Sequence, residues 1–502
     1  MNGRHSYDLC VIGGGINGTG IARDAAGRGL SVLLIEQNDL ASATSSASSK
    51  LIHGGLRYLE YGEFRLVREA LQEREILFRN APHLIQTRTF ILPRAKEIRP
   101  AWMIRTGLFL YDHLARRKAF HGSRRIGRRE SRYLEPLAES PQAFAYSDGW
   151  VDDSRLAVLN AVDAQERGAT ILTRTECTAI ASGPENWSLT LLSKKTGQHF
   201  ERTAKTVVNA AGPWVRHLLD QTGLSDEKTP QMRLVKGSHI IVPRLYEGNH
   251  CYILQQPDRR IVFALPYEQD FTLIGTTDTP FAFEQNPAKV AIDEQEKTYL
   301  LQAVNHSFKE KIDTDRILFS YSGVRPLLED AAASARAVTR DYKIHKIQKD
   351  SLNLYSIFGG KITTYRHLAE DVVDRITKRP AWTARTPLPG GDIPACDMGA
   401  FIARQKNRYA WAPETLIVRT AYAYGTRMDA ALNHAADMTG LGRTFGDDLY
   451  EAEIRYLIDR EFACTTEDIL WRRSKRGMHV NPKTVAALEE YLHRHPKPTD
   501  CS

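Results

Sequence analysis

The chain has 502 residues, of which 42% are hydrophobic and 25% are charged. This length exceeds what one hydrophobic core usually supports, so two or three domains are expected, and the composition excludes a disordered or collagen-like protein. The formal net charge of +8 is uneven, because residues 94–132 contain twelve basic residues and three acidic ones.

The six cysteines are scattered and form no CxxC pair, which favours reduced thiols and gives no reason to predict a metal site. Residues 1–7 precede the first predicted strand and contain no apolar core of a signal peptide. No apolar run reaches the ~18 residues that a membrane-spanning helix requires. We therefore expect a cytoplasmic protein that does not cross a membrane.

The N-terminal segment predicts a strand over 8–12, a helix over 16–27 and a second strand over 31–35. Between strand and helix, Gly13, Gly15 and Gly18 have the GxGxxG spacing, which permits a tight turn, close approach of a pyrophosphate and contact between helix and strand. Glu36 follows the second strand, where an acid can accept a hydrogen bond from a ribose hydroxyl. Together these features predict a dinucleotide site, without distinguishing FAD from NAD.

Three later segments favour a tightly held FAD. The serine- and threonine-rich loop 44–50, followed by Gly54 and Gly55, offers small hydrogen-bonding groups to a long cofactor. The strand-to-glycine unit 207–214 could close over the adenine, and the glycines in 358–364 could direct N–H groups at the flavin ring. Each segment also fits an ordinary polar loop, strand end or helix start.

The remaining pattern predicts an α/β fold with three domains. Apolar residues recur at helical spacing in 64–78, short β-like runs dominate after residue 171, and helical segments follow the proline- and glycine-rich stretch 387–394. We predict a discontinuous Rossmann-like FAD domain (1–85, 145–230 and 320–385) and an interleaved antiparallel-sheet substrate domain (86–144 and 231–319). A helical C-terminal domain covers 390–502.

Six strings in the chain are long or uncommon: 11–18 (VIGGGING), 44–60 (TSSASSKLIHGGLRYLE), 99–114 (RPAWMIRTGLFLYDHL), 237–239 (GSH), 321–327 (YSGVRPL) and 358–366 (FGGKITTYR). Through them the chain resembles the aerobic, FAD-dependent glycerol-3-phosphate dehydrogenases of the D-amino-acid-oxidase and glycine-oxidase superfamily, over nearly its whole length. The resemblance implies oxidation of sn-glycerol 3-phosphate to dihydroxyacetone phosphate, with hydride transfer to FAD and electrons passed to membrane quinone. It leaves the oligomeric state open, with a homodimer as one candidate.

The resemblance also implies a set of site residues. Substrate binding falls to Arg57, Tyr58, Arg325, Arg340 and Lys361, and a phosphate dianion suits guanidinium and ammonium partners. The predicted cofactor-binding residues are Gly13, Gly14, Gly15, Ile16, Asn17, Gly18, Glu36, Thr44, Ser45, Ser46, Ser48, Ser49, Lys50, Gly54, Gly55, Cys177, Ala211, Gly212, Gly360, Lys361, Ile362 and Thr363.

The base that removes the hydroxyl proton stays open at this stage. A neutral histidine is a natural proton acceptor for alcohol oxidation. His53 is the first choice because it lies close to Arg57 in the chain, and His239 is the reserve. Arg325 could stabilise the alkoxide or share the role of base.

The basic segment is compatible with two functions, membrane contact and nucleic-acid binding, and with a purely structural role. Residues 99–118 mix aromatic and aliphatic side chains with Arg and Lys, a composition typical of a helix lying in a membrane interface. Because quinone is dissolved in the bilayer, we expect a peripheral, monotopic protein on the cytoplasmic face of the inner membrane that contacts anionic lipid of the inner leaflet. A buried amphipathic helix with a solvated basic tail is the structural reading. Nucleic-acid binding is disfavoured, because no recognition module accompanies the basic residues.

Two other functions are compatible with the sequence. A flavin oxidase acting on a 2-hydroxy or 2-amino acid would need a carboxylate clamp, whereas the several basic candidates suit a phosphate better. A non-catalytic, flavin-binding membrane sensor or scaffold is the second.

Overall fold

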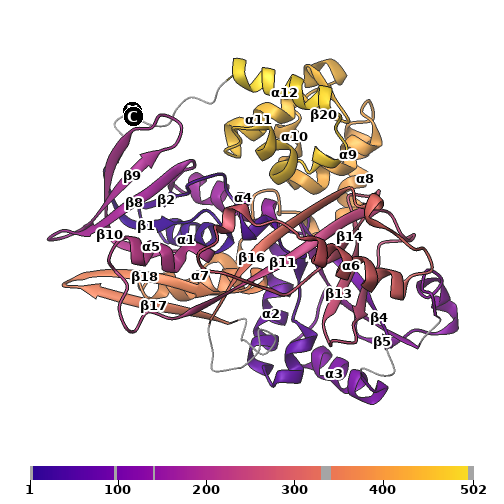
Figure 1. Ribbon diagram of the computed structural model, residues 1–502. Coiled ribbons are helices and arrows are strands. Elements are labelled where there is room, and N and C mark those ends of the chain that lie inside the picture. The colour runs from indigo at the N-terminus through magenta and orange to yellow at the C-terminus, as the bar shows by residue number, and fades with distance from the viewer. Residues whose placement is uncertain (1–3, 95–98, 140–141, 329–340, 496–502) are drawn as a thin grey trace.

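The computed structural model describes residues 4–94, 99–139, 142–328 and 341–495, and its strands form two large sheets (Figure 1). The first sheet has a parallel centre with an antiparallel strand at one edge. Its order is β17 (Tyr342–Lys349), β18 (Leu352–Gly359), β10 (His199–Asn209), β1 (Ser6–Ile12), β2 (Val32–Ile35) and β7 (Thr170–Leu172), with β8 (Thr175–Ser182) and β9 (Trp187–Ser193) attached through β10.

Both faces of the first sheet are buried, as expected for a parallel sheet. Leu9 and Val11 of β1 point to one face, where they meet helices α1 (Ile16–Gly27), α4 (Asp153–Glu166) and α7 (Tyr365–Asp374). Cys10 and Ile12 point to the opposite face, toward β8, β9 and α5 (Val215–Gln221). Successive side chains of a strand alternate between faces, so this apolar run serves two cores at once.

The second sheet is mainly antiparallel. Its order is β15 (Thr279–Phe281), β11 (Met232–Pro243), β14 (Phe271–Gly275), β13 (Ile261–Tyr267), β12 (Cys251–Gln255), β4 (Ile85–Pro93), β6 (Ala143–Val151) and β3 (Leu51–Ile52). Two further strands join it, β16 (Phe319–Leu328) beside β11 and β5 (Arg124–Arg125) beside β6. Helix α6 (Glu294–Ser307) covers one face, and α2 (Phe64–Asn80) and α3 (Ala101–His113) cover the other.

The α/β fold class predicted from the sequence is confirmed, and the helix and strands expected at the N-terminus are present within a residue or two. The chain passes from one sheet to the other after β2, β6, β10 and β16. Residues 145–151 and 320–328, which the division by sequence placed with the first domain, pair within the second sheet. Their partners lie far away in the chain, so no local pattern marks the crossing.

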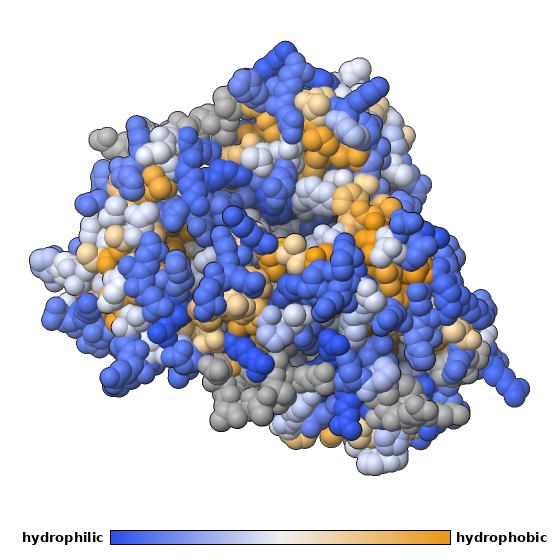
Figure 2. Space-filling view, in the orientation of Figure 1, coloured by the Kyte–Doolittle hydropathy of each residue, from blue (hydrophilic) through white to orange (hydrophobic). Residues whose placement is uncertain are grey.

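The C-terminal domain is a helical unit with its own hydrophobic core, drawn in light orange and yellow in Figure 1. It comprises α8 (Met398–Arg408), α9 (Glu414–Tyr424), α10 (Met428–Ala431), α11 (Glu451–Arg460), α12 (Pro482–Arg494) and a small hairpin of β19 (Thr444–Gly446) and β20 (Leu449–Tyr450). Side-chain oxygens of Asp397 and Asn481 cap α8 and α12. On the face shown in Figure 2 hydrophilic residues dominate, with smaller apolar areas between them. Within the described ranges no helix is long and apolar enough to cross a bilayer.

Candidate active site

A cavity of about 930 Å³ begins at the carboxyl ends of β1 and β2 and reaches the second sheet. At one end it is lined by Gly13, Gly15 and Glu36, and at the other by side chains such as Ile253 and Phe263. Ligands of open α/β sheets bind outside the carboxyl ends of the strands. The cavity therefore starts where the predicted dinucleotide turn lies and ends against a different domain.

The glycine turn is shaped so that only glycine fits two of its positions. Gly13 has φ +114°, and a Cβ there would lie 2.5 Å from the carbonyl oxygen of Ala210. A Cβ on Gly18 would lie 1.9 Å from the carbonyl oxygen of Gly13, so α1 approaches the turn as closely as backbone atoms allow. Gly15 is the N-cap of α1, has no side chain that could accept the first N–H groups of the helix, and lines the cavity.

Glu36 is fixed at the end of β2. Its carboxylate accepts hydrogen bonds from the N–H of Gly14 at 2.7 Å and of Asn38 at 2.8 Å. Burial raises the pKa of Glu36, and these two backbone donors oppose the rise. The carboxylate lines the cavity beside Gly13, which is the position expected of a ribose-binding acid.

The loop 44–50 lies across α1 and is tied to three elements. Ser45 Oγ accepts the N–H of Ile16 at 2.9 Å, and Thr44 Oγ1 donates to the carbonyl of Val324 in β16 at 2.7 Å. Ser48 Oγ donates to Asp153 Oδ2 at 2.7 Å, at the start of α4. These contacts hold Thr44, Ser45, Ser48 and Ser49 in the cavity wall.

The segments around His53 and Lys361 face each other in the middle of the cavity. Lys361 Nζ donates to the carbonyl oxygen of His53 at 2.5 Å, and the N–H of His53 donates to Thr363 Oγ1 at 3.2 Å. Gly55, with φ +84°, begins the short 3₁₀ helix that carries Arg57 and Tyr58. Two segments about 300 residues apart thus form one wall.

The basic side chains predicted for the substrate are collected in this region. Arg325 of β16 is paired with Asp278 and donates to Thr276 Oγ1 at 2.8 Å. Its guanidinium lies over Gly237, where a Cβ would be 2.1 Å from Nη2. Arg325, Lys361, Arg57 and Tyr58 line the cavity. The predicted substrate ligand Arg340 lies outside the described residues.

The two candidate bases occupy different environments. His53 lines the cavity, whereas His239 is buried behind it, with Nε2 at 2.9 Å from Ser49 Oγ and its ring stacked on Tyr321. Burial, together with the charges of Lys361 and Arg74, lowers the pKa of His53 well below its ordinary value. Burial, Arg325 and Lys50 do the same for His239. Both imidazoles are therefore neutral at physiological pH, and His53 is the one in contact with the cavity.

The other predicted residues divide into two groups. The cavity wall also includes Ile16, Asn17, Cys177, Ala211, Gly212, Gly360 and Ile362. The wall does not include Gly14, Gly18, Ser46, Lys50, Gly54, Thr363 or His239. Lys50 is 1% exposed and donates to Asp153 Oδ1 at 2.7 Å, and the N–H of Gly54 donates to Tyr111 Oη at 2.7 Å.

A protein-family comparison matches residues 8–365 to the family described as FAD dependent oxidoreductase. The chain belongs to this family. Residues 381–494 match the C-terminal domain of alpha-glycerophosphate oxidase. The family match spans more than half of the chain and contains every residue that lines the cavity.

Individual relatives cover almost the whole chain. A glycerol-3-phosphate dehydrogenase of Pseudomonas aeruginosa is 50% identical over 97% of this chain and 95% of its own length. A D-erythritol 1-phosphate dehydrogenase of Brucella abortus is 48% identical over 97% of each chain. Among solved structures, the glycerol-3-phosphate dehydrogenase of Bacillus halodurans complexed with FAD matches with a TM-score of 0.77 and 28% identity, covering 98% of this chain and 90% of that one.

FAD is the cofactor of this oxidoreductase, as the family description states, and the residues that line the cavity suit it. The backbone cradle at Gly13 to Gly18 would hold the pyrophosphate, and Glu36 the adenosine ribose. Asn17 lines the cavity with a buried side-chain oxygen that has no hydrogen-bond partner among the described residues. Gly360, with φ +106°, and Lys361 lie beyond Asn17, where the flavin ring would face the basic side chains.

Several contributors to the site were missed from the sequence. Asp278 and Thr276 orient Arg325, but they follow β14 and carry no motif of their own. Arg99, assigned only to the membrane segment, lines the cavity and donates to Glu60 Oε2 and Gln255 Oε1, both at 2.9 Å. Tyr111, which supports Gly54, was counted only as an apolar residue of that segment. No group of His, Cys, Asp or Glu within the described ranges is arranged to hold a metal ion.

Proposed function

We propose that this enzyme oxidises sn-glycerol 3-phosphate to dihydroxyacetone phosphate with FAD and passes the electrons to membrane quinone. The observation that carries the proposal is the meeting of Arg325, Lys361 and Arg57 in the cavity that begins at the dinucleotide turn. A phosphate dianion is matched by a guanidinium fork and an ammonium. The relatives from Pseudomonas aeruginosa and Bacillus halodurans are named for this substrate.

The side chains have separate tasks in the reaction. Arg325, oriented by Asp278 and Thr276, and Lys361 bind the phosphate and so fix the C2 hydroxyl. Bound FAD supplies the chemistry of a hydride acceptor for C2. His53 Nε2 or Nδ1 takes the hydroxyl proton, since its imidazole is neutral and lies in the cavity wall.

Substrate charge assists this proton transfer. In the free protein burial and the cations Lys361 and Arg74 keep the pKa of His53 low, which makes it a weak base. A bound dianion between Lys361 and Arg325 offsets those charges and raises the pKa of the imidazole. His53 thus becomes a stronger base when the phosphate is in place.

Anaerobic addition of glycerol 3-phosphate to the purified yellow protein tests the proposal. We expect the flavin absorption band to bleach within the mixing time or shortly after. Bleaching by lactate or an amino acid, but not by glycerol 3-phosphate, would identify a different flavin oxidase. An unchanged band with all of them would favour the non-catalytic sensor.

A longer polyol phosphate is a second candidate substrate. The relative from Brucella abortus named for D-erythritol 1-phosphate is nearly as similar to this chain as the one named for glycerol 3-phosphate. Both compounds carry a phosphate on a terminal carbon beside a secondary hydroxyl, so the same basic residues suit either. Comparing the rate constants for flavin reduction by the two compounds decides between them, and the faster one is the substrate.

The proposed membrane contact is supported by α3. Trp102 and Phe109 are 69% and 60% exposed, and Trp102, Met103 and Leu110 of the same helix line the cavity. The helix therefore links the flavin site to a surface with exposed aromatic side chains, next to Arg116 and Arg117. This arrangement suits an enzyme that lies on the inner leaflet of the cytoplasmic membrane and exchanges electrons with quinone.

Liposome flotation tests this contact. Replacing Trp102 and Phe109 together by serine should weaken binding to anionic liposomes, because two interfacial aromatic side chains are lost. Phe283→Ser, which removes an aromatic side chain exposed on another segment, is the control. Equal binding by both variants, or binding to DNA in place of liposomes, would contradict the membrane proposal.

A further inference from the structure

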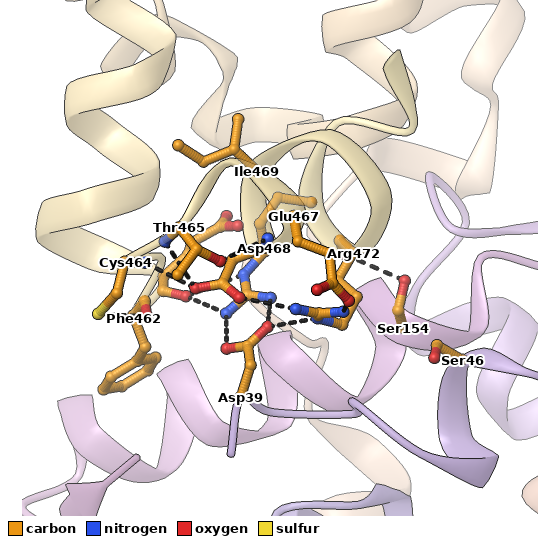
Figure 3. A network of polar contacts seen from close by, with 12 residues as sticks. Asp39, Ser46, Ser154, Phe462, Cys464, Thr465, Glu467, Asp468, Ile469 and Arg472 are labelled. Carbon is orange, nitrogen blue, oxygen red and sulfur yellow. Dashed lines mark hydrogen bonds and ion pairs between the residues drawn. The ribbon is translucent and has the colours of Figure 1, made fainter. Parts of the chain in front are cut away.

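Three residues of the C-terminal domain hold both ends of the loop that lines the FAD site, Arg472 and Arg473 by direct contact and Lys475 through the start of α4. This loop, residues 39–50, begins at Asp39 and ends at Lys50, and we call it the flavin loop. Figure 3 shows Asp39 next to the Arg472 side chain, with Ser154 and Ser46 on the other side of Arg472. None of the described residues of the C-terminal domain lines the cavity.

The first end of the flavin loop is held by two arginines. Arg473 forms two parallel hydrogen bonds to the Asp39 carboxylate, at 2.7 and 2.8 Å, and Arg472 Nε donates to the same carboxylate at 2.6 Å. Asp39 is 2% exposed and Arg473 1% exposed. Two residues after Asp39, Ala41 lines the cavity and donates its N–H to the carbonyl of Gly14 at 3.0 Å.

The second end is held through the start of α4. Lys475 Nζ donates to Ser154 Oγ at 2.7 Å and lies 3.3 Å from Asp152 Oδ1 and 4.0 Å from Asp153 Oδ1. Asp153 in turn accepts from Ser48 Oγ and Lys50 Nζ, both at 2.7 Å. Lys475 is thus two contacts away from Ser48, a residue of the cavity wall.

The arginines come from an unusual local structure. Residues Asp468–Arg473 form a short π-helix, and such turns are rare and frequently occur at functional sites. Burial disfavours the charge of Asp468, but Arg174, Arg473 and Arg472 more than offset this and lower its pKa to about 2. The cluster therefore stays ionised, although well-packed apolar residues usually join two domains at a lower desolvation cost. The two parallel hydrogen bonds from Arg473 set the orientation of the Asp39 carboxylate, which suits a positioning role.

We propose that Arg472, Arg473 and Lys475 are positioning residues for FAD: the C-terminal domain holds the flavin loop in its binding conformation, so FAD affinity depends on this contact. The residues act through Asp39 and Asp153 and do not touch the cofactor. The proposal concerns the cofactor alone and is independent of which polyol phosphate is oxidised.

The test compares Lys475→Met and Arg473→Met with Arg427→Met in the full-length protein. Arg427 pairs with Glu166 and also joins the C-terminal domain to α4, but at the opposite end of that helix, about 20 Å from Asp153 at 1.5 Å per residue. FAD is removed, and its dissociation constant is measured by titrating FAD into each apoprotein. Hydrogen–deuterium exchange of peptides covering residues 39–50 is measured with and without FAD.

Loss of a partner that orients a binding group commonly reduces affinity by about 10- to 100-fold, as in metal sites. We expect about a tenfold higher FAD dissociation constant and faster exchange of the flavin loop for Lys475→Met and Arg473→Met, with Arg427→Met within about twofold of the parent. Unchanged affinity in the first two variants, or equal losses in all three, would overturn the proposal. If either methionine variant fails to fold, Lys475→Gln, which keeps a donor for Ser154, is measured instead and should fall between the parent and the tenfold loss.

Discussion

His53 is the residue on which the chemistry depends most directly. His53→Asn removes the proton acceptor from the cavity wall but keeps a polar side chain, so the rate of flavin reduction should fall by about 10²- to 10⁴-fold. FAD should remain bound, because the loop 44–50 and the glycine turn are unchanged. Stopped-flow measurement of flavin reduction gives the rate. His239→Asn is the control and should have a smaller effect, since His239 lies behind the wall; the reverse order would make His239 the base.

Arg325 should govern substrate affinity without affecting the cofactor. Arg325→Lys keeps the charge but removes the fork that bonds Thr276 and pairs with Asp278. A hydrogen bond to a charged group contributes about 1.5–3 kcal/mol, so glycerol 3-phosphate should bind roughly 10- to 100-fold more weakly. Flavin absorbance per protein measures retained FAD, and titration of the substrate measures affinity. A collapse of flavin content would show that Arg325 supports the cofactor instead; half-buried Arg202→Lys, which does not line the cavity, is the matched control.

At the scale of elements, the contact between β1 and α1 should tolerate no side chain. Gly18→Ala would place a methyl group 1.9 Å from the carbonyl oxygen of Gly13 and push the helix from the turn. Overpacking typically costs about 1–3 kcal/mol, and here it also displaces the N–H groups that face the cofactor. We expect a lower thermal midpoint and a loss of bound FAD. Gly127→Ala, where a Cβ meets no atom within 4 Å, should change neither, and a Gly18→Ala variant with its full content of FAD would contradict this account.

The strand, glycine turn and helix of β1 and α1 could be predicted from the sequence, whereas the position of β16 in its sheet could not. The glycine turn and Glu36 lie close together in the chain, so hydrophobic periodicity and glycine spacing are sufficient to predict the dinucleotide site. β16 carries Arg325, but its place beside β11 depends on pairs such as Val235 with Arg325, about 90 residues apart. Local patterns hold no information about such pairing, which is why the partners Asp278 and Thr276 were missed.

At the scale of the whole molecule, the C-terminal domain shows where sequence reasoning stopped. Its helices and its boundary near residue 390 were expected from composition, and residues 381–494 match a single domain. Its contact with the flavin loop was not expected, because Asp39 and Arg473 carry no motif and meet only after the domains pack together. Buried ion pairs between distant segments are visible only in the folded chain.

The junction of the domains should also give the molecule a pH-dependent stability. Glu268 lies in the turn between β13 and β14, near Asp152, Lys475, Lys50 and Arg476. Burial and the charge of Asp152 raise its pKa to about 7, and the three cations oppose this. In the unfolded chain a glutamate titrates near 4.5. The folded state therefore binds more protons between these values, and the stabilisation present below pH 4.5 is lost as the pH rises through about 7.

Glu268→Gln stays neutral and should be more stable than the parent at pH 8, by on the order of 2 kcal/mol. Thermal midpoints at pH 5 and pH 8 measure the change, with the exposed Glu185→Gln as control. Equal pH dependence in the parent and Glu268→Gln would show that Glu268 is charged throughout this range.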